Sequence, residues 1–179
     1  MIEALRLFSR KGLRETSIRD IAHASGYTNP ALYKHFSGKD ELARELFVAC
    51  YRNAARTLDA AMSECDTFEL RLRALVHTYT TGFDAFPDAV MFATEHVAHF
   101  WPDVPRSLKK RTTITLIREL IELGEAEGCV PSDVDNEVRT AMVAGALGQL
   151  SRLIYLGGLR GPASKYADDL TTTLLRGLS

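Results

Sequence analysis

The stretch TNPALYKHFSGKDEL, residues 28–42, predicts a very short helix that carries several polar side chains. Thr28 can cap its first turn, and Pro30 is tolerated there because first-turn amides have no helical partner. Leu32 and Phe36 are four residues apart and therefore lie on the same side of the helix. We expect these two side chains to seat the helix on its neighbours and leave its polar side exposed.

A second, much longer helix begins immediately afterwards. The pattern breaks at Ser37-Gly38, and Ser37 with Asp40 starts another helix. The following residues, from 39 to about 64, contain no Gly or Pro, which predicts one continuous helix.

A third helix precedes the short one and completes a recognisable arrangement. Residues 17–24 are helical in pattern, with a capping-box-like start at Ser17 and Asp20, and Gly26 closes the turn. Two short helices around a tight turn with Gly are typical of a helix-turn-helix, whose second helix enters the DNA major groove. This explains why the second helix is short and polar: only its first turns must reach the base edges.

The segment FSRKGLRETSIRDIAHASGYTNPALYKHFSGKDEL resembles the N-terminal domain of the tetracycline-repressor (TetR) family of bacterial transcriptional regulators. The resemblance covers about residues 2–47 and rests on many fixed spacings at once. Members of this family usually carry several more residues, often basic, before the first helix, and such residues add phosphate contacts. The matching positions are Phe8, Gly12, Thr16-Ser17, Asp20-Ile21-Ala22, Gly26, Leu32-Tyr33, His35-Phe36, Lys39 and Leu42.

The resemblance implies a set of DNA contacts that the side-chain chemistry makes sensible. An Asn amide can pair with adenine and an Ala methyl can contact a thymine methyl, so Asn29 and Ala31 are the expected specificity residues. The remaining positions are expected to bind phosphates or support the tip, with Lys34 able to reach either backbone or base. The full expected set is Thr16, Ser17, Thr28, Asn29, Pro30, Ala31, Tyr33, Lys34, His35 and Lys39.

The rest of the chain also reads as helices, and no strand alternation is evident. A first helix is expected to end near Gly12, which makes four with the three described above. Five more are expected at about 67–85, 88–101, 105–127, 133–157 and 163–177. We predict an all-α fold of about nine helices. Residues 1–46 form a DNA-binding domain with a three-helix head, and residues 47–179 form a ligand-binding and dimerisation domain, as the resemblance implies.

Composition agrees with a DNA-binding head on an acidic body. Hydrophobic residues make up 46% of the 179 residues, and no apolar run is long enough for a membrane span. Residues 1–56 carry a net charge of +4, whereas the whole chain carries −1, so the head suits an anionic partner. The three cysteines, at positions 50, 65 and 129, are odd in number and widely spaced, which favours free thiols in a reducing cytoplasm.

Aromatic residues gather in residues 79–101, which is typical either of a packed core or of a small-molecule cavity. By resemblance, TetR-like proteins hold their inducer between the middle helices. The expected lining residues are Phe83, Phe92, His96, Phe100, Ile117 and Met142.

Two further features have competing interpretations. Glu95, His96 and His99 could suggest a metal-dependent enzyme. The two histidines lack an evident third ligand, however, so we expect no enzyme, metal or cofactor. RSLKKR at 106–111 is interpreted as a solvated basic face, the alternative being a docking point for an acidic ligand or for Asp103 or Asp88.

The predicted helix at 133–157 contains Ala141, Ala144, Gly145, Ala146 and Gly148 in its middle. Because glycines weaken a helix, close approach of another helix is the natural compensation. By resemblance this helix and the last one pair with their mates in a homodimer.

The sequence therefore predicts a ligand-responsive regulator, expected to be a repressor, that binds a palindromic operator as a homodimer and is released by a small apolar or aromatic effector. The alternative within the same fold is a DNA-binding dimer with no small-molecule effector.

Overall fold

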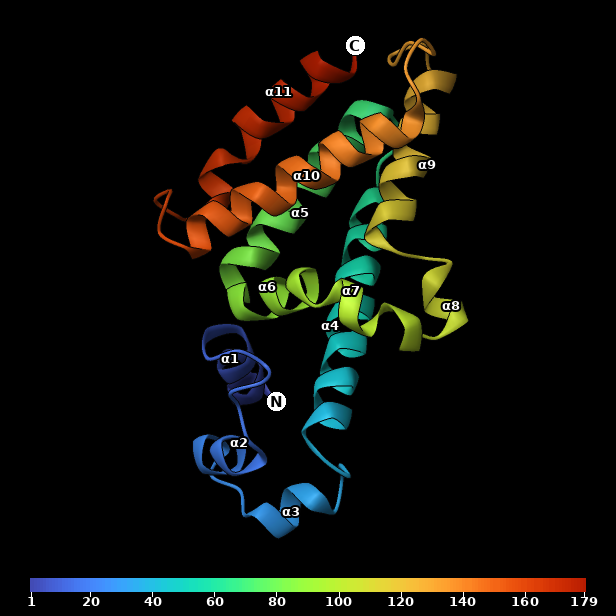
Figure 1. Cartoon of the computed structure of the whole chain (residues 1–179). Coiled ribbons are helices and arrows are strands. Elements are labelled where there is room, and N and C mark those ends of the chain that lie inside the picture. Colours follow the sequence, from blue (N-terminus) through green and yellow to red (C-terminus); the bar gives the residue numbers. More distant parts are fainter. The chain divides into compact units, whose positions relative to one another are not determined.

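The computed structural model describes residues 1–179 and contains only helices and connecting segments (Figure 1). The all-α prediction is confirmed. The α-helices are α1 (Ile2–Arg10), α2 (Ile18–Ser25), α3 (Asn29–Tyr33), α4 (Lys39–Ser63), α5 (Phe68–Ala85), α6 (Pro87–Glu95), α7 (Val97–Phe100), α8 (Arg106–Lys109), α9 (Thr113–Ala126), α10 (Asn136–Tyr155) and α11 (Ala167–Leu178), with 3₁₀ turns at η1 (Trp101–Asp103) and η2 (Ala163–Tyr166).

Two of the predicted helices are interrupted, which explains why the structure has more than nine. The expected helix at 88–101 is divided at His96, whose backbone leaves the helical region with φ −104° and ψ 9°. The expected helix at 105–127 is divided before Thr112, which adopts an extended conformation and forms a capping box with Thr115 to start α9. Neither interruption involves Gly or Pro, so the sequence pattern contains no stop signal for it.

The chain divides into two compact units. The first comprises Met1–Tyr51 with Asp88–Pro105, and the second comprises Arg52–Pro87 with Arg106–Ser179. Helix α4 is continuous through the boundary at residue 51. The first unit is therefore larger than the three-helix head, because it includes α6 and α7.

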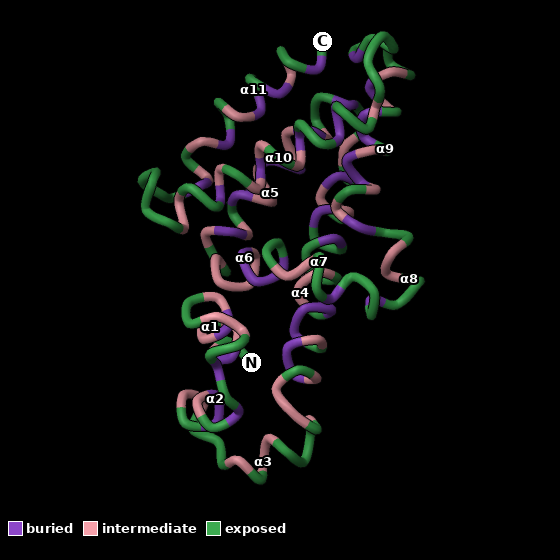
Figure 2. Tube along the Cα trace, in the orientation of Figure 1, coloured by how far each residue is buried: buried purple, intermediate pink, exposed green.

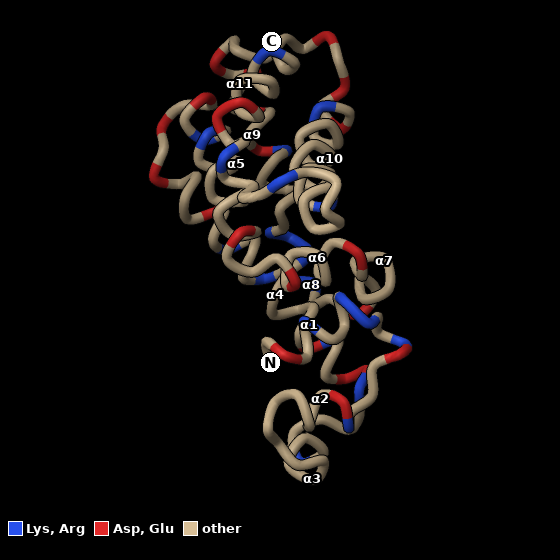
Figure 3. Tube along the Cα trace, turned by 90° about the vertical axis from the view of Figure 1, so that its left-hand side faces the viewer, with Lys and Arg blue, Asp and Glu red and all other residues tan.

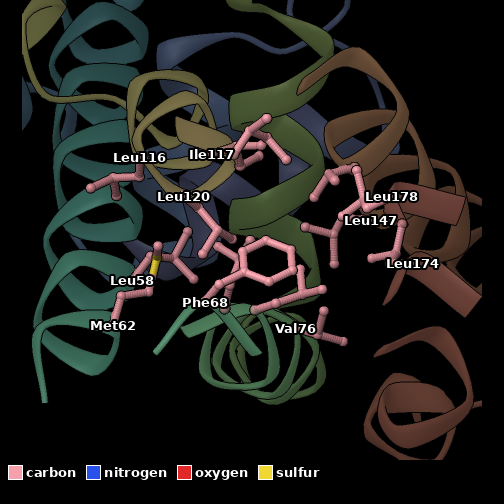
Figure 4. Close-up of a cluster of buried hydrophobic side chains, with 14 of the residues drawn as sticks. Leu58, Met62, Phe68, Val76, Leu116, Ile117, Leu120, Leu147, Leu174 and Leu178 are labelled. Atoms are coloured by element: carbon pink, nitrogen blue, oxygen red, sulfur yellow. The ribbon is translucent and has the colours of Figure 1, made fainter. Parts of the chain in front are cut away.

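The core of the second unit is built by the inward faces of several helices. Helix α5 packs against α9, α10 and α11, and α9 packs against α10 (Figure 1). Figure 4 shows Leu58 and Met62 of α4 next to the α9 side chains Leu116 and Leu120. Buried positions alternate with exposed ones along these helices (Figure 2), as expected for amphipathic helices around one core.

No helix combines the length and the apolar character that crossing a bilayer requires.

Candidate functional site

The link between α1 and α2 fixes the base of the head. Gly12 adopts φ +93°, a left-handed conformation that ends α1 and is natural only for glycine. Ser17 then caps α2: its hydroxyl accepts from the Asp20 amide, and the Asp20 carboxylate accepts from the Ser17 amide. Gly26 adopts φ +70° and forms the tight turn into the next helix. The predicted capping box and turn glycines are confirmed.

Helix α3 is short, neutral and well defined at its start. Thr28 is its N-cap, and the threonine hydroxyl accepts a hydrogen bond from the Ala31 amide at 3.4 Å. The five residues NPALY carry no charge, and Figure 3 marks Lys and Arg positions in blue on the trace next to α2. No residue of α3 is buried: Pro30 and Tyr33 are exposed, and Asn29, Ala31 and Leu32 are half-buried.

Helix α4 begins where the sequence predicted, with a different partner for its cap. Both the amide and the hydroxyl of Ser37 donate to the Glu41 carboxylate at 2.6 Å, rather than to Asp40. These hydrogen bonds, the side-chain one first, lower the pKa of Glu41. They hold the link between α3 and α4 in one conformation.

Most of the expected DNA-contact residues lie on accessible surface of the first unit. Tyr33 is 55% exposed. The half-buried positions are Asn29, Ala31 and Lys39, and the exposed positions are Ser17, Thr28, Pro30, Tyr33, Lys34 and His35.

Thr16 differs from the other nine. Its side chain is 1% exposed, and its hydroxyl donates to the Gly12 carbonyl at 2.8 Å. The hydroxyl therefore stabilises the end of α1 and is not available to DNA. We leave Thr16 out of the proposed contact set for this reason.

Two lysines of the head also have partners within the protein. Lys39 Nζ donates to the Arg14 carbonyl at 3.1 Å, which joins the start of α4 to the α1–α2 connection. Lys11 Nζ lies 2.9 Å from Asp20 Oδ2. This hydrogen bond, followed by those from Ser17, lowers the pKa of Asp20 to about 2. Asp20 is therefore an anion that fixes the base of α2.

Tyr27 is an accessible head residue that sequence reasoning did not select. It is 62% exposed and immediately precedes the Thr28 cap. It also lines an apolar cavity of about 220 Å³ with Ala4, Ile21 and Leu32. A tyrosine next to the cap of a reading helix is the signal that could have identified it.

Three of the expected effector residues lie together in the first unit. Phe92 and Phe100 are buried, and their ring centroids lie 6.2 Å apart. His96 lies beside both, with its ring centroid 4.7 Å from that of Phe92 and 6.3 Å from that of Phe100. His96 Nδ1 is 3.1 Å from the Phe92 carbonyl oxygen, which can only accept, so Nδ1 carries the proton and Nε2 can accept from a ligand.

The same aromatic cluster contacts the helices of the head. Phe8 of α1 stacks on Phe92 with centroids 5.6 Å apart, and Phe47 of α4 lies 5.2 Å from Phe100. Next to these rings, the Ser9 hydroxyl donates to the Asp88 carbonyl at 2.8 Å. Helices α6 and α7 are thus joined to α1 and α4, which the sequence did not predict.

The other three expected effector residues lie in the second unit. Phe83 is buried in α5, and Ile117 of α9 is part of the hydrophobic core. Met142 of α10 is 38% exposed. The effector role of the whole set stays a prediction.

The structure also bears on the Glu95, His96 and His99 group and on the basic stretch at 106–111. No group of three or more His, Cys, Asp or Glu side chains is arranged to hold a metal ion, so Glu95, His96 and His99 gain no further ligand. In the basic stretch, Arg111 pairs with Asp59 and Glu119, rather than with Asp103 or Asp88.

These features define the chain as a helix-turn-helix DNA-binding protein. The sequence model described as "Bacterial regulatory proteins, tetR family" matches residues 3–46. The HTH-type transcriptional repressor KstR2 of Rhodococcus jostii (strain RHA1) is 31% identical over 140 residues, which are 75% of this chain and 68% of that protein. The chain therefore belongs to the TetR family and is a DNA-binding transcriptional regulator.

Solved structures agree on the fold. KstR2 of Mycobacterium tuberculosis, a ketosteroid transcriptional regulator, superposes with a TM-score of 0.79 at 22% identity, over 99% of this chain and 91% of that chain. FadR from Bacillus subtilis, in complex with stearoyl-CoA, superposes with a TM-score of 0.80 at 12% identity, over 99% of this chain and 97% of that chain.

Proposed function

We propose that this protein is a repressor that binds a palindromic operator as a homodimer in the cytoplasm and is released by a small apolar or aromatic effector. The observation that supports the proposal is α3 itself, a short neutral helix capped by Thr28, with Asn29 and Ala31, both half-buried, in its first turn. An amide and a methyl group at that position suit base edges in the major groove. We place the boundary between the DNA-binding domain and the ligand-binding and dimerisation domain at residue 46, so that residues 1–46 contact the DNA.

Phosphate contacts come from the residues around this tip. Tyr33, Lys34 and His35 are exposed at the end of α3, and Ser17 and Thr28 are exposed at the starts of α2 and α3. Lys39 Nζ already donates a hydrogen bond to the Arg14 carbonyl. It can contact a phosphate only with its remaining N–H groups or after breaking that hydrogen bond. We therefore assign Lys39 a positioning role in addition to its charge.

A stripe of exposed apolar residues on α10 supports the homodimer. Val138 is 60% exposed and Leu156 is 67% exposed, with Met142 and Leu153 between them. These positions, together with Gly145 and Gln149, recur every three or four residues and so share one face of the helix. Burying such a stripe against a second copy is favourable, and a two-fold dimer matches a palindromic operator.

The aromatic cluster of Phe92, His96 and Phe100 supports an effector that is largely apolar with one hydrogen-bonding group. The acyl chain of the stearoyl-CoA bound to FadR is apolar, and KstR2 is named a ketosteroid transcriptional regulator, which favours an effector with a large apolar part. An effector that displaced these rings would disturb the contacts of Phe8 and Ser9 with α6. To release DNA, it must bind the DNA-incompetent state more tightly than the DNA-bound state.

The test is binding to duplexes that the wild-type protein selects from random DNA, measured by fluorescence anisotropy over a salt series. Lys34→Ala should reduce the magnitude of the slope of log affinity against log salt by about two, because each of the two protomers loses one phosphate contact. Lys110→Ala removes an equally exposed lysine of the second unit and should leave the slope unchanged. A wild-type protein that bound selected and scrambled duplexes equally would refute the proposal.

A further inference from the structure

The Arg111 side chain joins α4 to α9 through two double hydrogen bonds. Its Nε and Nη2 donate to the two carboxylate oxygens of Asp59 at 2.9 and 2.5 Å. Its Nη1 lies 2.7 and 2.6 Å from the carboxylate oxygens of Glu119. Asp59 belongs to α4 and Glu119 to α9, so one guanidinium holds two helices of the second unit.

The backbone on both sides of this contact is fixed. Arg111 immediately precedes Thr112, whose capping box with Thr115 starts α9. On the α4 side, Leu58 and Met62 flank Asp59 and are buried in the core. The hydrogen bond from Arg111 is the main cause of the lowered pKa of Asp59. The contact is therefore an ion pair between two ordered segments.

Apolar packing and this ion pair constrain α4 differently. Leu58 and Met62 pack closely in the core, and this packing holds α4 against its neighbours without prescribing the orientation of any one polar partner. A guanidinium is a rigid planar fork, and two-point hydrogen bonding fixes both the distance and the orientation of its partner. Arg111 thus adds an orientation-dependent constraint on α4 to the one that the core provides.

We propose that Arg111 is a positioning residue for DNA recognition, which fixes α4 relative to α9 and thereby sets the placement of the reading head. Helix α4 is continuous from Lys39 to Ser63. At 1.5 Å per residue, the distance from Lys39 to Asp59 is roughly 30 Å. A tilt of about 5° at one end of such a rod moves the other end by about 2.5 Å, enough to break a hydrogen bond to a base.

The inference rests on the proposed operator-binding dimer and predicts a specific pattern. A palindromic operator requires both heads at the right separation, whereas a half-site requires only one folded head. Freedom of α4 therefore weakens binding to the palindrome and spares the half-site. It also gives an effector that moves α9 a direct connection to α4.

The experiment compares Arg111→Met with wild type on a selected palindromic duplex and on its half-site. We expect the palindrome to be bound about five- to ten-fold more weakly, because pre-organisation is lost, and the half-site to change less than two-fold. Asp59→Asn should have the same effect. The double variant should be no worse than either single variant, because the two residues act through one contact.

Arg118→Met is the matched control. Arg118 lies on α9, next to Glu119, and forms a two-point pair with Glu137 at 2.7 and 3.0 Å, but that pair does not involve α4. It should leave both duplexes unaffected. If Arg111→Met proves unstable in a thermal melt, Arg111→Lys takes its place. It keeps the positive charge but lacks the planar guanidinium, so it should also bind the palindrome more weakly than wild type.

Three results would overturn the inference: Arg111→Met within two-fold of wild type on the palindrome, an equal loss on the half-site, or the same loss in Arg118→Met. A wild-type protein that selects no DNA sequence would instead overturn the proposed function, and this inference with it.

Discussion

Leu153→Glu should separate the proposed dimer without unfolding the chain. Leu153 lies on the exposed apolar stripe of α10 and is 38% exposed in the single chain. Because a two-fold dimer contains each residue twice, one substitution places two carboxylates in the interface. The chain itself should tolerate the change, since the side chain already reaches solvent.

The magnitude follows from the area that remains to be buried. Complete burial of a leucine is worth about 1.5–3 kcal/mol. The exposed 38% of Leu153 then contributes about 0.6–1.1 kcal/mol per copy. Two unpaired carboxylates in the interface add several kcal/mol of desolvation. The total exceeds about 3 kcal/mol, so the dimer dissociation constant should rise roughly a hundred-fold or more.

Sedimentation velocity over a dilution series measures this constant, and far-UV circular dichroism checks the fold. Leu70→Glu is the matched control, because Leu70 is 51% exposed in the first turn of α5, away from the stripe. Its dimer constant should equal that of wild type. The reasoning fails if Leu153→Glu dimerises like wild type, or if both variants dissociate equally.

Three further substitutions test the packing and electrostatics of the chain. Gly124→Ala should lower the free energy of unfolding by about 1–3 kcal/mol, because the new Cβ would lie 2.6 Å from a Val130 methyl carbon. Urea titration measures this loss. Gly82→Ala is the control, because a Cβ at Gly82 would meet open space. Asp20→Asn should be less stable than wild type at pH 7. The Asp20 pKa is lowered from 3.8 to about 2 in the folded chain, so the ionised form is the stabilising one and the difference in urea midpoint should shrink as pH falls from 4 towards 2. Thr16→Val removes a buried hydrogen bond and should lower the free energy of unfolding by about 1 kcal/mol in thermal melts, yet leave the salt slope of DNA binding unchanged.

The local structure of the head could be predicted from the sequence. The capping box at Ser17 and Asp20, the left-handed glycines at 12 and 26, and the cap at Thr28 all follow from residue types at fixed short spacings. These features depend on hydrogen bonds and backbone angles within four residues of one another. The family resemblance added the expected roles of the exposed residues.

The interruptions within the predicted helices could not be predicted in the same way. His96 ends α6 within an apolar segment that contains no Gly, and Thr112 starts α9 after a basic stretch that reads as helical. Helical propensity differs little among such residues, so tertiary packing decides where the helix stops. A single sequence gives no sign of that choice.

The long-range contacts were decided only by the tertiary structure. Ser9 meets Asp88 across 79 positions in the chain, and Arg111 meets Asp59 across 52. Serine, aspartate and arginine are common on helix surfaces, and nothing near them in the sequence identifies a partner. The sequence by itself determined a helix-turn-helix head, because its caps and turns depend on short-range spacing. The tertiary structure decided that α6 and α7 join the head and that α4 is held to α9, because such contacts depend on how distant helices pack.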